Sequence, residues 1–137
     1  MTTRIQSLIK RASRALSEDV TKSQLDKIEA AFDKLFAHVG INVEFTKHFI
    51  DRVNDPRNVP EITVDDLIEI FGDAYKKHGK AISQLPKDAE RVLKDIETDV
   101  NIPFVLVHNP RTKELEMVNK TIMRKHNFAT SSPVLTV

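Results

Sequence analysis

The stretch VNIPFVLVHNPRTK, residues 100–113, decides the fold class of this chain. Its first half places apolar side chains at Val100, Ile102, Phe104 and Leu106, and this alternation predicts a β-strand. Its second half is rich in Asn, Pro and charged side chains, which predicts a turn. A further apolar run over residues 115–123 predicts the returning strand. This part of the chain is therefore expected to form an antiparallel hairpin.

Upstream of this hairpin the apolar periodicity is helical. Thr21 and Gln24 have the spacing of a capping box, and Gly40 lies where a helix C-cap belongs, so a helix is predicted over residues 22–39. Thr46 is a candidate N-cap for a short helix over residues 47–54. Two N-terminal helices and this third one precede the predicted strands.

The middle of the chain adds one more helix and two ambiguous segments. Thr63 and Asp66 resemble a capping box before a helix that we expect to end at Gly79. Residues 41–45 alternate in polarity and predict a short strand or an extended link, and residues 91–96 fit either a strand or a helix. The expected architecture is α+β, with helices followed by a small antiparallel sheet of about three or four strands packed against them.

The length of 137 residues fits one compact domain. We divide it into an N-terminal helical arm or hairpin (1–40), an α+β core (41–128) and a C-terminal tail (129–137). The tail ends in an apolar run that predicts either an added edge strand or a docking peptide. In the second case Val134 and Leu135 are the partner-binding side chains.

Residues 3–17 have the pattern of a basic amphipathic helix. Four cationic side chains lie largely outside the apolar stripe: Arg4, Lys10, Arg11 and Arg14. The stripe itself consists of Ile5, Leu8, Ile9, Ala12 and Leu16. Such a helix packs on its own domain or docks on a partner or a membrane surface.

Composition excludes several classes of function. There is no Cys, so disulfides, thiolate catalysis and iron–sulfur clusters are ruled out. Three Gly residues cannot build a Gly-rich phosphate loop, and the five His residues lack zinc-type spacing, so we expect no metal and no cofactor. No apolar run is long enough for a transmembrane helix. Without Trp and with one Tyr, the chain offers no aromatic platform for stacking bases.

His48 and Arg52 are the first candidates for chemistry. Four positions apart on a predicted helix, they share one face. Histidine titrates near neutral pH and can transfer a proton, and a guanidinium can hold a phosphate, so the pair suits metal-free RNA cleavage. In the alternative, His48 caps or packs and Arg52 pairs with a nearby acid such as Asp55 or Asp66. Residues 55–60 are interpreted only as a break after the helix.

A second basic patch lies in the returning strand. Lys120 and Arg124 would point to one face of a strand, and Thr121 and Lys125 to the other. Either face can donate hydrogen bonds to a phosphate. In the alternative, these cations pair across strands with acids such as Glu114 or Glu116, a contact worth less than about 1 kcal/mol.

Three stretches together suggest a family. The chain reads FTKHFIDRV over residues 45–53, NIPFVL over 101–106 and KTIMRK over 120–125. This resembles small proteins of tailed bacteriophages, often associated with the virion, whose fold is similar to that of the barnase, EndoU, colicin and RelE ribonucleases. The resemblance covers about residues 43–128. It implies that His48 is the general acid or base, Arg52 the phosphate clamp, and Thr121 or Arg124 the contribution from the sheet.

Three functions are therefore expected in turn. The first is a bacteriophage virion or assembly component, located in the virion or the host cytoplasm, with other virion proteins or a second copy as partners. The alternative is a metal-independent endoribonuclease or toxin-like nuclease that uses His48 and Arg52. The third is a regulator that binds RNA or DNA without cleaving it. A structural role predicts no cleft around His48, whereas catalysis predicts that His48, Arg52 and a cation of the sheet meet in one.

Overall fold

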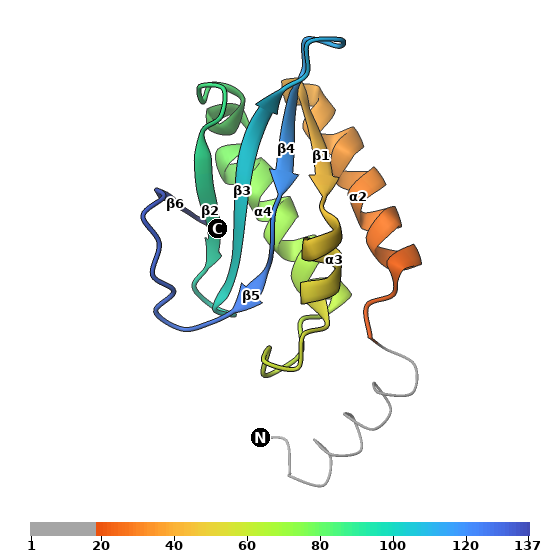
Figure 1. The fold of residues 1–137 in the computed structure, drawn as a ribbon, viewed down its shortest axis with the longest axis vertical. Coiled ribbons are helices and arrows are strands. Elements are labelled where there is room, and N and C mark those ends of the chain that lie inside the picture. Colours follow the sequence, from red (N-terminus) through yellow and green to blue (C-terminus); the bar gives the residue numbers. More distant parts are fainter. Residues whose placement is uncertain (1–18) are drawn as a thin grey trace, which may run out of the picture.

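The computed structural model describes residues 19–137, and these form an α+β fold (Figure 1). Within them three α-helices precede or interrupt a six-stranded sheet. The predicted fold class is confirmed. The amphipathic segment expected over residues 3–17, with all its apolar and basic side chains, lies outside the described residues.

The helices and strands follow the predicted order. The helices are α2 (Lys22–Phe36), the short 3-10 helix Ala37–Val39, α3 (Lys47–Val53) and α4 (Val64–Ser83). The strands are β1 (Ile41–Phe45), β2 (Glu90–Asp95), β3 (Val100–His108), β4 (Leu115–Asn119), β5 (Met123–Arg124) and β6 (Val134–Thr136). The ambiguous segment at 91–96 is thus a strand, and the tail contributes an edge strand.

The sheet is mixed rather than wholly antiparallel. Its strands lie in the order β1-β4-β3-β2-β6, and β5 pairs with the start of β3. The predicted hairpin β3–β4 and the pair β2–β3 are antiparallel, whereas β1 lies parallel to β4 and β6 parallel to β2. Both parallel strands join the sheet through long connections, which is what parallel pairing requires. Pairing between distant segments of this kind leaves no local pattern in the sequence.

Helices α2 and α4 cover one face of the sheet, which lies in front of them in Figure 1. The alternate side chains of β3 predicted from the sequence point to that layer and are fully buried there: Val100, Ile102, Phe104 and Leu106. Aromatic side chains of the helices and of β1 meet above them, with the Phe45 ring 4.4 Å from that of Phe49 and 5.4 Å from that of Phe71. Burial of such side chains dominates the stability of the domain.

The predicted capping signals are present. Thr21 and Gln24 form a complete capping box at α2, and Thr63 and Asp66 form another at α4. Gly40 ends the first helical segment with a φ of 76°, a conformation that a side chain disfavours. Helix α4, by contrast, continues past Gly79 to Ser83, because Ile82 extends its apolar face and is fully buried.

Strand β1 is an edge strand whose free N–H groups are sealed by helix α2. The backbone N–H of Val43 donates to the Asp33 carboxylate at 2.8 Å, and that of Phe45 donates to the Glu29 carboxylate at 2.6 Å. An unpaired edge exposes donors that recruit foreign strands, so natural sheets cover or block it. Here two acidic side chains, one turn apart on α2, replace the missing neighbouring strand.

Replacing Glu29 or Asp33 by Ala is expected to lower the free energy of unfolding by about 1–3 kcal/mol, because a partly buried N–H loses its acceptor. Urea unfolding measures this loss. The matched control is Glu69→Ala on the exposed side of α4, which we expect to change stability by less than about 0.5 kcal/mol. Equal effects at the three positions would show that the carboxylates do not stabilise the edge.

Candidate functional site

The candidate site forms around a β-bulge in the strand row made by β4 and β5. Asn119 pairs with Phe104 and Met123 with Asn101, so the three residues 120–122 lie opposite only two, 102 and 103. One extra residue on one strand defines a bulge, and bulges often occur beside functional sites because they redirect side chains. The bulge therefore sets the direction of the side chains that follow it.

Pro103 explains why the bulge lies at this point. Its carbonyl accepts a hydrogen bond of 2.9 Å from the Lys120 N–H, but its ring nitrogen has no hydrogen to donate in return. Proline inside a sheet is confined to edges and bulges for this reason. The Thr46 hydroxyl, at the N-cap of α3, donates to the Lys120 carbonyl at 3.0 Å and so ties α3 to the bulge.

A pocket of about 510 Å³ lies between α3, the loop after it and the bulge. Its lining includes four of the residues predicted from the sequence and Lys125 of the basic patch: His48, Arg52, Thr121, Arg124 and Lys125. Asp55, Arg57 and Asn58, from the loop that the sequence marked only as a break, complete the polar lining. The two candidate patches thus meet in one hollow.

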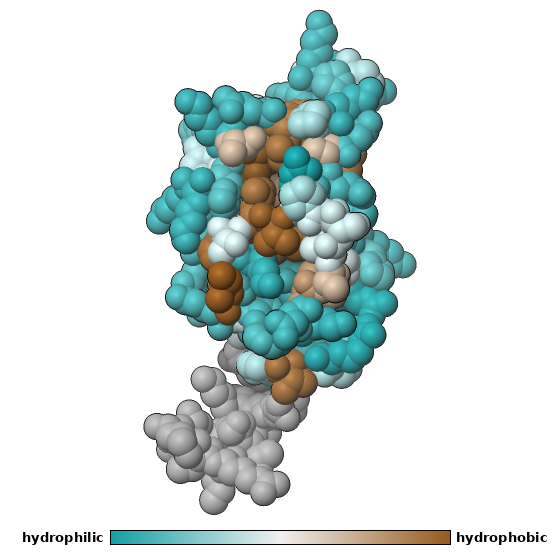
Figure 2. Space-filling view, turned by 90° about the vertical axis from the view of Figure 1, so that its left-hand side faces the viewer, coloured by the Kyte–Doolittle hydropathy of each residue, from teal (hydrophilic) through white to brown (hydrophobic). Residues whose placement is uncertain are grey.

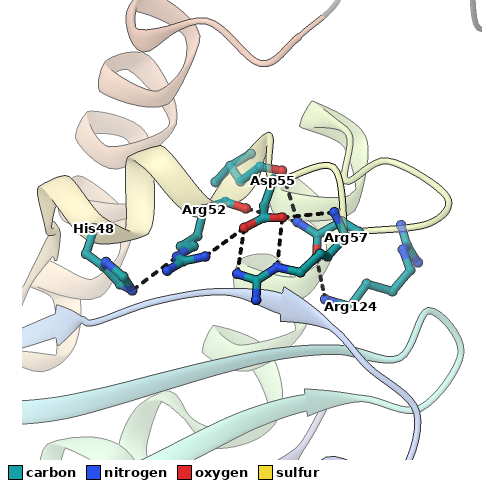
Figure 3. A network of polar contacts seen from close by, with 7 residues as sticks. His48, Arg52, Asp55, Arg57 and Arg124 are labelled. Atoms are coloured by element: carbon teal, nitrogen blue, oxygen red, sulfur yellow. Dashed lines mark hydrogen bonds and ion pairs between the residues drawn. The ribbon is translucent and has the colours of Figure 1, made fainter.

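A continuous row of polar contacts crosses the pocket from His48 to Arg57 (Figure 3). Thr46 caps α3 by accepting from the Phe49 N–H at 3.0 Å, and the short helix then places His48 and Arg52 on one face. The Arg52 Nε–H donates to His48 Nε2 at 3.4 Å. In this arrangement Nε2 carries no proton and is the ring nitrogen that faces the guanidinium.

Asp55 holds both arginines of the row. Arg52 Nη1 donates to its Oδ2 at 2.7 Å, and Arg57 donates from Nε to Oδ1 at 3.1 Å and from Nη2 to Oδ2 at 2.8 Å. The Arg57 hydrogen bonds, followed by that of Arg52, hold the pKa of Asp55 well below its usual range. The carboxylate is therefore ionised throughout the neutral range. The pairing of Arg52 with Asp55 is one of the alternatives that the sequence left open.

Arg124 is a structural arginine as well as part of the pocket wall. Its side chain is only 10% exposed and donates to the carbonyls of Pro60, Thr98 and Glu61 and to the Asp66 carboxylate. The buried Asn58 side chain accepts from the Arg124 N–H at 2.9 Å and donates to the carbonyl of Arg52. These bonds fasten the loop that carries Asp55 and Arg57 to β5.

The other predicted cations are placed differently. Lys120 points away from the pocket lining and its Nζ contacts the Glu90 carboxylate at 3.0 Å in an exposed pair, the cross-strand alternative noted above with a different acid. Lys125 is exposed and lines the pocket, and Thr121 is partly buried beside it. Four cationic side chains and one carboxylate thus surround the hollow: Arg52, Arg57, Arg124, Lys125 and Asp55. Their excess of positive charge favours an anion.

A second, acidic hollow lies between α2 and the β1–β4 pair, with Glu29, Asp33, Glu44 and Glu116 in its lining. Partial burial, then the charges of Glu116 and Glu29, raises the pKa of Glu44. Two of these acids already accept the edge N–H groups of β1. Among residues 19–137 no group of His, Asp and Glu side chains has the arrangement of a metal site.

The predicted partner-binding residues of the tail are divided by the fold. Leu135 is partly buried and packs on the core, whereas Val134 is 41% exposed on the edge strand β6. Figure 2 views the side of the molecule where β2 and β6 lie and shows a band of apolar side chains between polar ones. The remaining candidates, Ile5, Leu8, Ile9, Ala12 and Leu16, fall outside the described residues.

No protein-family model, curated protein or solved structure matches the chain. The resemblance to phage proteins and ribonucleases therefore stays a prediction. None of the helices described between residues 19 and 137 combines the length and the apolar character needed to cross a membrane. The functional argument depends on the geometry of the pocket.

Replacing Arg124 by Lys is expected to lower the free energy of unfolding by about 2 kcal/mol, because one ammonium group cannot satisfy three carbonyls and a carboxylate. Thermal or urea unfolding measures the change. The matched control is Arg111→Lys in the exposed β3–β4 turn, with an expected change below about 0.5 kcal/mol. Equal stability of the two variants would contradict the structural role of Arg124.

Replacing Glu44 by Gln is expected to stabilise the protein at pH 7 by roughly 0.2–1 kcal/mol, the range of exposed charge pairs. The raised pKa means that ionised Glu44 destabilises the folded state, and this cost vanishes as pH falls below the unfolded pKa of about 4.3. Urea unfolding at pH 7 and pH 3 measures both values. A gain that persists at pH 3 would have another cause, and Glu69→Gln is the control.

Proposed function

We propose that the pocket binds phosphate groups of RNA and that the chain is a metal-independent endoribonuclease. The observation that carries this proposal is the meeting of His48, Arg52 and Arg57 with the bulge residues Thr121 and Lys125 in one hollow. A purely structural role predicts no such cleft around His48. Phosphate is the anion that fits this set of donors best, since guanidinium groups bind it through paired hydrogen bonds.

His48 is the group that transfers the proton in this proposal. Its Nε2 takes the proton of an RNA 2′-hydroxyl, and the 2′-oxygen forms a bond to the neighbouring phosphorus. The bond from phosphorus to the 5′-oxygen breaks, and that oxygen takes a proton from water. The products are a 2′,3′-cyclic phosphate and a 5′-hydroxyl. Nε2 has to exchange its contact with Arg52 for the hydroxyl, and Arg52 is then free to turn toward the phosphate.

Arg52, Arg57 and Lys125 stabilise the extra negative charge that develops on phosphorus oxygens during this step. Asp55 holds the two guanidinium groups in place before any ligand arrives. Groups that are fixed in advance need no reorganisation during the reaction, and this is where their catalytic advantage comes from. Arg124 is a positioning residue, because its donors are engaged within the protein.

A contact role in a bacteriophage virion or another assembly is the second function that we propose. It is supported by the exposed apolar side chains at the β2–β6 edge, Val134 with 41% and Ile96 with 64% of their surface exposed. A partner of this edge would be another virion protein or a second copy of the chain. The two functions use different surfaces, so one chain can serve both.

Incubation of the full chain with a mixed RNA pool in EDTA tests the first proposal. We expect cleavage to products with 2′,3′-cyclic phosphate ends. His48→Ala is expected to lower the rate about 100- to 10,000-fold, the usual contribution of a positioned proton-transfer group. Gel analysis of end-labelled RNA, with mass spectrometry of the product ends, measures both.

The matched control is His108→Ala, an exposed histidine at the end of β3 outside the pocket, which should leave the rate unchanged. Cleavage that survives in His48→Ala would remove His48 from the mechanism. No cleavage by the wild type, with RNA binding retained, would leave a binding site without catalysis. Absence of both would favour the assembly role.

A further inference from the structure

Arg57 is held in an unusual way for so exposed a side chain. The side chain is 76% exposed, yet one carboxylate receives three of its hydrogen bonds. Besides the contacts from Nε and Nη2, the backbone N–H of Arg57 donates to Asp55 Oδ1 at 2.9 Å. Asp55 is fixed in turn by Arg52. An exposed arginine normally samples many rotamers, so this arrangement fixes its guanidinium group before a ligand binds.

The hydrogen bonds to Asp55 lie along one edge of the guanidinium group. Nε and Nη2 form that edge, and the carboxylate meets it side-on, as the row in Figure 3 shows. This geometry uses donors in the plane of the group and leaves its two flat faces unoccupied by Asp55. A guanidinium plane fixed in this way stacks on flat π-systems, nucleobases among them.

The rest of the pocket supports a base beside the phosphate position. Its lining contains no Phe, Tyr or Trp, and the one Tyr of the chain packs its ring 5.3 Å from that of Phe36 on the helical side. Ile122 and Met123 give the hollow an apolar wall. A volume of about 510 Å³ lies in the range of small-ligand pockets and has room for a single nucleotide.

We infer that the pocket takes one unpaired nucleotide, whose base stacks on the Arg57 guanidinium while its phosphate contacts Arg52 and Lys125. This inference rests on the proposed function and names its substrate class as single-stranded RNA. In a duplex both faces of a base are covered by neighbouring bases, so the stack on Arg57 requires an unpaired one. Arg57 thereby replaces the aromatic platform that the composition of the chain does not supply.

Fluorescence anisotropy with uncleavable 2′-O-methyl oligonucleotides tests this inference. Three probes of equal length are compared: a single strand, a single strand that is abasic at its central positions, and a duplex. The wild type is expected to bind the single strand at least about tenfold more tightly than the abasic strand or the duplex, since stacking on one side chain contributes a factor of this size. Arg57→Lys keeps the charge but removes the plane.

In Arg57→Lys the affinity for the single strand is expected to fall about tenfold, as far as in Arg57→Ala measured at high salt, while the affinity for the abasic strand changes less than about twofold. Arg111→Lys is the matched control, and circular dichroism verifies that each variant is folded. Equal loss for the single and abasic strands, no loss in Arg57→Lys, or equal binding of duplex would overturn the inference and leave the phosphate site standing. Failure of the wild type to bind any probe would overturn the proposed function itself.

Discussion

A single missing hydrogen-bond donor, the absent N–H of Pro103, shapes the functional half of this domain. Because the central strand β3 cannot complete its ladder at that residue, the opposite row of β4 and β5 takes up one extra residue. The bulge places Thr121 and Lys125 in the wall of the pocket, and the Thr46 contact to the Lys120 carbonyl brings helix α3 against it. The position of His48 and Arg52 follows from that contact.

Charge then organises what the backbone has brought together. One carboxylate, Asp55, fixes two guanidinium groups, and a third, that of Arg124, fastens the loop on which Asp55 stands. The arginines of this site therefore have two distinct tasks. Arg124 is satisfied by carbonyls and contributes to stability, whereas Arg52 and Arg57 are held from one side only and present their remaining surface to a ligand. Sequence position alone does not separate these tasks.

Local patterns predicted much of this molecule. The alternation along β3, the capping residues Thr21, Thr46 and Thr63, and the shared helix face of His48 and Arg52 all depend on neighbours within a few residues. The parallel pairing of β1 and β6 was not predictable in this way, because it depends on segments far apart. Asp55 and Arg57 were overlooked for a related reason. Their turn was interpreted only as a helix break, although an acid two residues before an arginine is a signal that could have found them.

The sealed edge of β1 limits how this domain can associate. Since Glu29 and Asp33 occupy its free N–H groups, strand addition is blocked on that side and is left to the short strand β6. Two copies that joined sheets through β6 would use the same surface twice and form a closed two-fold pair. Neither copy would then offer a second open edge, so the pair could not extend into a fibre. The acids on α2 thus set the upper limit of any assembly built by sheet extension.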